Sequence, residues 1–195
     1  MLPDVRRDGV VSTRLRQWAP AGEAEAAVEA AVAERKADWP DGLVSFSGYV
    51  ETSGDGVFTY EQWATPRPGE DEYRIYRHRV FAEEITPGCI VIVAVELADP
   101  EAPKRWVDTV FGAFDEQSRP SAGLRGAFFH LGTAGPRVVN YAEWASEAAY
   151  DAATFSNTTA IDASPKLRAV RDFPGLRSLV VRRYRPLVSL AGPRG

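Results

Sequence analysis

The chain has 195 residues, of which 23 are basic and 27 acidic, so its formal net charge is −4. This composition is that of a globular protein, and the charge provides no positive field for nucleic acid or an anionic membrane. One cysteine and two widely spaced histidines exclude an internal disulfide and the short-spaced histidine metal motifs. No apolar run is long enough to span a membrane, and no secretory signal precedes the first charged residues. We therefore expect a cytoplasmic protein without a metal site.

An internal repeat organises the sequence. Residues 42–63 match residues 123–144 without a gap, at an offset of 81. The identical pairs are Gly42/Gly123, Leu43/Leu124, Thr52/Thr133, Gly54/Gly135, Val57/Val138, Tyr60/Tyr141 and Trp63/Trp144. In both copies a β-rich stretch precedes this segment and runs into a proline that opens a helical pattern. The sequence therefore predicts two tandem units, residues 1–86 and 87–195.

The elements of the first copy follow from hydrophobic periodicity and turn residues. We predict strands over 10–18, 43–51, 57–63 and 73–81, and a helix over 22–37 with Pro20 at its first position. Residues 64–71 are rich in proline and glycine and too short for a normal helix. The first copy is therefore expected to have lost its second helix.

The second copy is more complete. We predict strands over 90–97, 124–131, 137–144 and 179–184, and a helix over 101–118 with Asp99 as its N-cap. Ser146 is expected to cap a further helix that carries Tyr150, and Ser164 to cap a short one. The tail after Pro186 is expected to be frayed.

A βαββαβ unit is typical of a ferredoxin-like layer of four antiparallel strands with helices on one face. The other face needs cover, which a second copy supplies. The fold class expected is therefore α+β, with two tandem ferredoxin-like units forming an intramolecular dimeric α/β barrel, and a further homodimer remains open.

The segment from His130 to Tyr150 holds the candidate chemistry. Because side chains alternate along a strand, Asn140 and Trp144 are expected on one face, a polar group beside a flat apolar wall. Such a lining suits a planar aromatic ligand. Tyr150 follows one turn into the next helix and offers a phenol. Taken singly, each of these residues also has an ordinary packing role.

The run Val-Val-Asn140-Tyr-Ala-Glu-Trp144, with His130 before it and Tyr150 after it, resembles the antibiotic biosynthesis monooxygenase family. The resemblance is greatest to its cofactor-free members, which oxidise polyketide anthrones to quinones with O2. It implies a dimeric α/β barrel and a pocket lined by the equivalents of His130, Asn140, Trp144 and Tyr150. It covers the second copy well and the first copy loosely.

The first copy departs from this pattern. Tyr49 and Thr59 stand at the positions of His130 and Asn140, whereas Trp63 keeps the tryptophan. The family also has an arginine beyond the tyrosine, for which this sequence offers only Lys166 and Arg168 in a region that does not align. We therefore expect the active site in the second copy.

The function expected from these residues is a cofactor-independent monooxygenase with O2 as co-substrate and an aromatic small molecule as partner. Asn140 would donate to a developing oxyanion, Tyr150 would relay a proton, and His130 has the titration range of a base. Trp144 would wall the ring system. Further lining of the substrate pocket is expected from Trp106, Phe114 and Phe128.

Two alternatives remain open at this stage, and haem chemistry is disfavoured. Haem chemistry in this fold needs an axial histidine after the tryptophan, and no histidine follows His130. A non-oxidative polyketide cyclase or isomerase would use the same pocket without O2. A non-catalytic module would only bind a metabolite.

Overall fold

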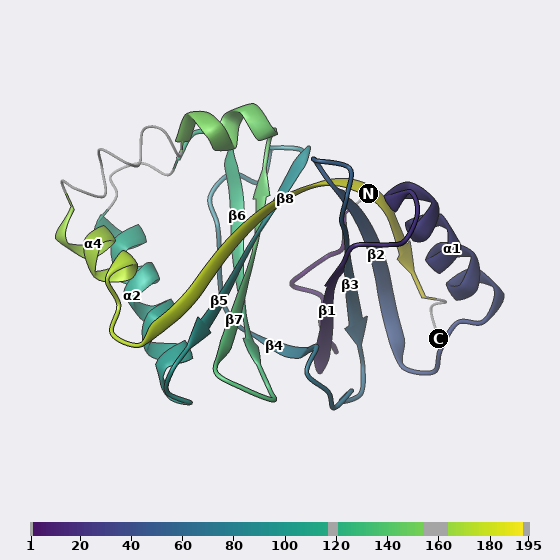
Figure 1. The fold of residues 1–195 in the computed structure, drawn as a ribbon, viewed down its shortest axis with the longest axis horizontal. Coiled ribbons are helices and arrows are strands. Elements are labelled where there is room, and N and C mark those ends of the chain that lie inside the picture. Colours follow the sequence, from purple (N-terminus) through teal and green to yellow (C-terminus); the bar gives the residue numbers. More distant parts are fainter. Residues whose placement is uncertain (1, 117–120, 154–163, 193–195) are drawn as a thin grey trace. The chain divides into compact units, whose positions relative to one another are not determined.

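The computed structural model describes residues 2–116, 121–153 and 164–192 (Figure 1). Its strands are β1 (Ser12–Trp18), β2 (Leu43–Glu51), β3 (Val57–Trp63), β4 (Glu72–Val80), β5 (Cys89–Leu97), β6 (Leu124–Gly132), β7 (Arg137–Trp144) and β8 (Leu176–Ala191). Its helices are α1 (Ala24–Ala37), α2 (Ala102–Glu116) and α4 (Pro165–Arg171), with a further helical segment over residues 147–153. None of the helices in these described ranges has the length and apolar character needed to cross a membrane.

Hydrogen bonding orders the strands β1-β3-β2-β8-β5-β7-β6-β4, and this order closes as a barrel. β1 pairs with β3 and β4, β2 with β3 and β8, and β7 with β5 and β6, in each case antiparallel. The predicted fold class, an α+β chain whose repeated strands close into a barrel, is confirmed.

The chain divides into two compact units that are not continuous in sequence. Unit 1 comprises Met1–Arg74, Gly132–Ala134 and Arg183–Gly195, and unit 2 comprises Ile75–Leu131 and Gly135–Arg182. The strands β4 and β8 therefore begin in one unit and end in the other. The boundary between residues 86 and 87, which the sequence analysis placed between the two copies of the repeat, stays a prediction.

The sequence repeat is reproduced in the backbone. Leu43 pairs with Trp63 in unit 1, and Leu124 pairs with Trp144 in unit 2, each followed by a register shift on the first strand. Just before each leucine, Gly42 and Gly123 have φ angles of 78° and 85°, which favour glycine. The amide of the residue after each tryptophan donates to the carbonyl of this glycine at 2.8 Å. The two units thus turn their central hairpins in the same way.

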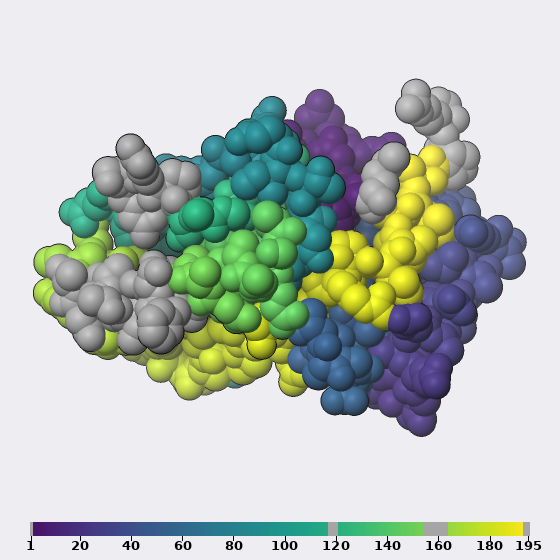
Figure 2. Space-filling model, turned by 90° about the horizontal axis from the view of Figure 1, so that it is seen from above, coloured from purple at the N-terminus to yellow at the C-terminus, as the bar shows by residue number. Residues whose placement is uncertain are grey.

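Among the described residues of unit 1, α1 is the helix that covers the sheet. α1 buries Ala24 and Val28, and Val28 approaches β2 so closely that a Cβ on Gly48 would lie 2.5 Å from it. Residues 64–71 contain no helix, as expected. An open groove of about 400 Å³ lies between α1 and β8, lined by Val28, Glu29, Val32, Ala33, Lys36, Leu187 and Val188. Figure 2 shows this yellow end of β8 at the surface of the unit.

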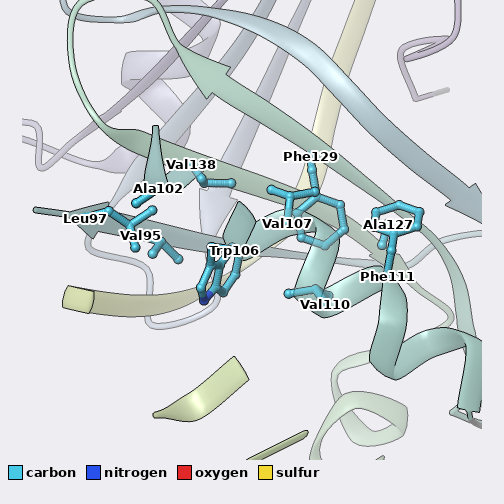
Figure 3. Close-up of a cluster of buried hydrophobic side chains, with 10 residues drawn as sticks. All are labelled: Val95, Leu97, Ala102, Trp106, Val107, Val110, Phe111, Ala127, Phe129 and Val138. Atoms are coloured by element: carbon cyan, nitrogen blue, oxygen red, sulfur yellow. The ribbon is translucent and has the colours of Figure 1, made fainter. Parts of the chain in front are cut away.

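In unit 2 the helices α2 and α4 pack on one face of the sheet. Figure 3 shows Trp106 and Phe111 of α2 directed toward Phe129 and Val138 of the sheet, and all four are buried. The side chain of Ser164 accepts a hydrogen bond from the amide of Leu167 at 3.3 Å, so the predicted cap of α4 is confirmed.

Two details of the sequence analysis are wrong. Pro20 does not occupy the first position of α1, because this helix begins at Ala24 after Glu23. The chain beyond Pro186 is not frayed as far as Ala191, because β8 continues to that residue by pairing with β2. The β-branched and leucine residues after Pro186 give the strand enough apolar surface to pack against α1.

Replacing Gly123 with alanine is expected to lower the free energy of unfolding by about 2 kcal/mol. The new methyl group would lie 2.7 Å from the Cβ of Ala149, in addition to the strain of a positive φ angle. Gly54→Ala is the matched control, because Gly54 has a φ of 91° but no atom within 4 Å of the new methyl group. We expect about 1 kcal/mol for this control, measured by urea unfolding. Equal losses in the two variants would contradict the close contact at Gly123.

Candidate functional site in unit 2

The strand β7 presents Asn140 and Trp144 to the helix-covered side of the sheet. Asn140 pairs with Phe129 of β6 and Val93 of β5, and directly paired residues of an antiparallel sheet share a face. Phe129 belongs to the cluster that packs against α2. Trp144 lies on the same side and packs with Val91 and Leu124. The sequence prediction that Asn140 and Trp144 share one face is therefore confirmed.

Tyr150 lies against the ring of Trp144. The two ring centroids are 5.3 Å apart, with the planes at 79° in an edge-to-face arrangement. The helical segment that carries Tyr150 is capped by Ser146, whose hydroxyl accepts from the amide of Ala149 at 3.1 Å. Gly123 lets this segment approach the sheet, because no side chain stands between it and Ala149. The predicted cap at Ser146 is confirmed.

Two buried polar atoms on this side of the sheet have no hydrogen-bond partner. Among the described residues of unit 2, Asn140 Oδ1 and Trp144 Nε1 are the buried side-chain atoms without a hydrogen-bond partner. One is an acceptor and the other a donor, and Trp144 is only 7% exposed. An unpaired buried polar atom costs about 1–3 kcal/mol, so such a pair calls for a functional explanation.

Aromatic side chains enclose the same region. The rings of Trp106 and Phe114 on α2 lie 6.3 and 6.4 Å from the ring of Phe129, the cross-strand neighbour of Asn140. Trp106 also connects α2 to α4, because its Nε1 donates to the carbonyl of Val170 at 3.4 Å. The structure thus brings Trp106 and Phe114 to the side of the sheet that carries Asn140. Phe129, which sequence reasoning left out, is the residue that connects them.

His130 and Phe128 lie on the opposite face of the sheet. His130 pairs with Val139, the neighbour of Asn140, and Phe128 pairs with Tyr141. The imidazole is fully buried, and its Nδ1 lies 3.1 Å from the carbonyl oxygen of Phe128. Burial lowers the pKa of His130 to about 4, against the opposing effect of its backbone hydrogen bonds with Val139 and Phe128. A neutral ring on the far face does not meet Asn140, so we leave His130 and Phe128 out of the proposed site.

The basic residue Lys166 lies on α4, where its Nζ is 3.1 Å from Glu116 and donates to the carbonyl of Gly112 at 3.3 Å. This places it on the exposed surface between α2 and α4 rather than beside Asn140. Within the described ranges, no three histidine, cysteine, aspartate or glutamate side chains gather in a way that could hold a metal ion.

The first copy does not reproduce the arrangement. Thr59 takes the place of Asn140 and pairs with Arg16 and Gly48. Tyr49 takes the place of His130 and packs against Phe58 with ring centroids 5.3 Å apart. Thr59 and Tyr49 therefore occupy the same places in the sheet of unit 1 as Asn140 and His130 do in the sheet of unit 2.

Comparison with solved structures places this architecture among known folds. A protein described as anthrone oxidase-like matches with a TM-score of 0.72 and 15% identity, over 92% of each chain. A Listeria monocytogenes ferredoxin-fold protein related to antibiotic biosynthesis monooxygenases matches with a TM-score of 0.56 and 13% identity, over 95% of this chain and 99% of that one. A heme-degrading enzyme from Listeria monocytogenes matches with a TM-score of 0.52 and 14% identity, over 89% and 98%.

No protein-family model matches the sequence, and no curated protein matches it either. The chain therefore has an α+β fold whose eight strands close into a barrel, and it shares this fold with structures described as anthrone oxidase-like and as related to antibiotic biosynthesis monooxygenases. The expected resemblance is confirmed at this level. Because one fold supports many activities, the activity has to be argued from the site.

Proposed function

We propose that the protein is a cofactor-independent monooxygenase that oxidises an anthrone-like phenolic substrate to a quinone with O2. The active site of this proposal is the helix-covered side of β7 in unit 2. The observation that carries it is the pair of buried unpaired atoms, Asn140 Oδ1 and Trp144 Nε1, set among aromatic side chains.

The two atoms define what a ligand must offer. Asn140 Oδ1 needs a donor such as a phenolic hydroxyl, and Trp144 Nε1 needs an acceptor such as a carbonyl or phenolate oxygen. The Cα atoms of residues four apart on a strand are separated by about 13 Å. A ligand that reaches both residues is therefore extended, and the surrounding rings favour a flat aromatic one. Fused-ring phenolic ketones combine these features.

The chemistry needs no group beyond the substrate and O2. The substrate loses a proton from its central methylene carbon, and the resulting oxyanion accepts a hydrogen bond from the amide nitrogen of Asn140. The anion passes one electron to O2, and the two radicals combine to a peroxide at that carbon. Loss of water leaves a carbonyl, so one oxygen atom enters the quinone and the other leaves as water.

The protein's task is to favour the anion and to exclude bulk water. The ring of Tyr150 lies beside Trp144, and its hydroxyl serves as the proton relay, a role that the position of His130 does not allow. Trp144 holds the flat face of the substrate, and its indole N–H contributes a second donor to an oxygen of the ring system.

The test is quinone formation by absorbance, together with oxygen uptake, in metal-free buffer with chelator and without flavin or nicotinamide. Turnover of an anthrone under air but not under argon is expected. Turnover that depends on added flavin would overturn the proposal. Conversion to an isomerised or cyclised product under argon would instead support the cyclase, and binding without conversion would support the non-catalytic module.

Replacing Trp144 with phenylalanine is expected to raise KM several-fold, with a much smaller change in kcat. The smaller ring loses contact area and the indole N–H, both of which act on bound substrate and transition state alike. Trp63→Phe in unit 1 is the matched control and should leave KM unchanged. Steady-state kinetics with the anthrone would contradict the assignment if the two variants behaved alike.

A further inference from the structure

Between Asn140 and Trp144 on the same face lies Ala142. Its cross-strand partner on β6 is Ala127, and both alanines are buried. At the equivalent positions of unit 1, 81 residues earlier, the paired residues are Glu61 and Phe46. The two hairpins share their turns, their register shifts and their tryptophans. At this one pair of positions, however, unit 1 has two large side chains and unit 2 has two small ones.

In unit 1 the carboxylate of Glu61 binds the tryptophan of the hairpin and an arginine of α1. Glu61 Oε2 accepts from the indole Nε1 of Trp63 at 3.2 Å, and Glu61 Oε1 accepts from Arg35 of α1 at 3.0 Å. Glu61 is only 3% exposed. The guanidinium of Arg67 lies 3.9 Å from the centroid of the Trp63 ring. The tryptophan of unit 1 is therefore bonded and covered by the chain itself.

In unit 2 none of these groups is available to the tryptophan. Ala142 has no acceptor, and its side chain ends at Cβ, as does that of Ala127. The indole N–H of Trp144 stays unpaired although the residue is buried. The indole N–H of Trp63 is therefore hydrogen-bonded and that of Trp144 is not, because Ala142 stands where unit 1 has Glu61.

We propose that the Ala127–Ala142 pair determines which unit binds substrate. The small pair leaves Trp144 Nε1 and Asn140 Oδ1 without a hydrogen-bond partner from the chain in unit 2, whereas Phe46 and Glu61 occupy the equivalent place in unit 1. This inference rests on the proposed site and adds to it that each chain binds one substrate molecule. Ala142 acts by leaving space and a free donor, so it is a specificity-determining residue rather than a catalytic one.

The test replaces Ala142 with glutamine, which resembles Glu61 in size and carries an amide oxygen without a buried charge. Calorimetry with a dihydroxyanthraquinone as stable product analogue measures affinity and stoichiometry. The wild type is expected to bind one molecule per chain, and Ala142→Gln to bind about tenfold more weakly or not at all. Glu61→Gln is the matched control in unit 1, and it should bind as the wild type does.

A second readout needs no ligand and shows whether the variant is folded. In the nitrogen–proton spectrum of the protein, the indole resonance of Trp144 should shift in Ala142→Gln, and its N–H should exchange more slowly because it is now hydrogen-bonded. An unchanged indole signal, or undiminished binding by Ala142→Gln, would overturn the proposal, as would two molecules bound per wild-type chain. No binding to the wild type would overturn both this proposal and the site. One-to-one binding without oxygen uptake would refute only the proposed function.

Discussion

Replacing Asn140 with alanine lowers kcat for anthrone oxidation by about 10²-fold or more if its amide holds the developing oxyanion. Removal of a single donor of this kind costs about 10²–10³ in kcat in other enzymes, because the site offers no water to replace it. The change keeps the Cβ atom and removes Oδ1, a buried atom that is unpaired in the protein alone. The folded state should therefore lose little stability.

Thr59→Ala is the matched control for this experiment. Thr59 stands at the equivalent position of unit 1. It pairs with Arg16 and Gly48, and its side chain is buried. Quinone formation is followed by absorbance under air for both variants and the wild type. Full activity of Asn140→Ala, or an equal loss in Thr59→Ala, would exclude Asn140 as the oxyanion donor and favour a cyclase or a binding module.

The second large effect concerns acid stability and His130. The ring is fully buried and its pKa is about 4, compared with 6.5 in the unfolded chain, because burial opposes the charged form. Between these two pH values the unfolded chain binds the proton and the folded protein does not. The contribution of His130 is therefore complete above about pH 6.5 and is lost as the pH falls toward 4, by about 3 kcal/mol in all.

His130→Asn isolates this contribution. The amide nitrogen of asparagine takes the place of Nδ1 and can donate to the carbonyl of Phe128, but it does not titrate. Urea unfolding at several pH values should show that the free energy of unfolding falls less steeply between pH 6.5 and 4 in the variant than in the wild type. His78→Gln, which changes the chain's other histidine, should keep the steep loss. Parallel curves for the wild type and His130→Asn would show that the buried ring does not control acid unfolding.

Much of the fold was accessible from the sequence because the chain repeats itself. The glycines and tryptophans of the central hairpins recur at a constant offset, and these residues set the turns and the register shifts. The caps at Ser146 and Ser164 were also predictable, because their side chains act on amides only three residues away. The start of α1 was misplaced because Pro20 lies in the turn before it rather than in the helix.

The face of His130 was not accessible from the sequence. Alternation along β7 relates Asn140 to Trp144, but the relation of His130 to Asn140 depends on the register between β6 and β7. A shift by one residue reverses the face of every side chain on a strand. The observed register pairs His130 with Val139, and so separates it from Asn140. The Ala127–Ala142 pair was missed for another reason, since alanine carries no chemical signal and only comparison with Phe46 and Glu61 gives it meaning.

The strand β8 has a consequence for how the chain folds during synthesis. Its last part pairs with β2, so that Ser45 lies opposite Ala191, and residues 183–191 count among the elements of unit 1. Every other strand has been made before β8 leaves the ribosome. The sheet of unit 1 therefore waits with the edge of β2 unpaired while all of unit 2 is translated. An open edge of this length invites pairing with a neighbouring chain, so expression yield should depend on how quickly translation reaches β8.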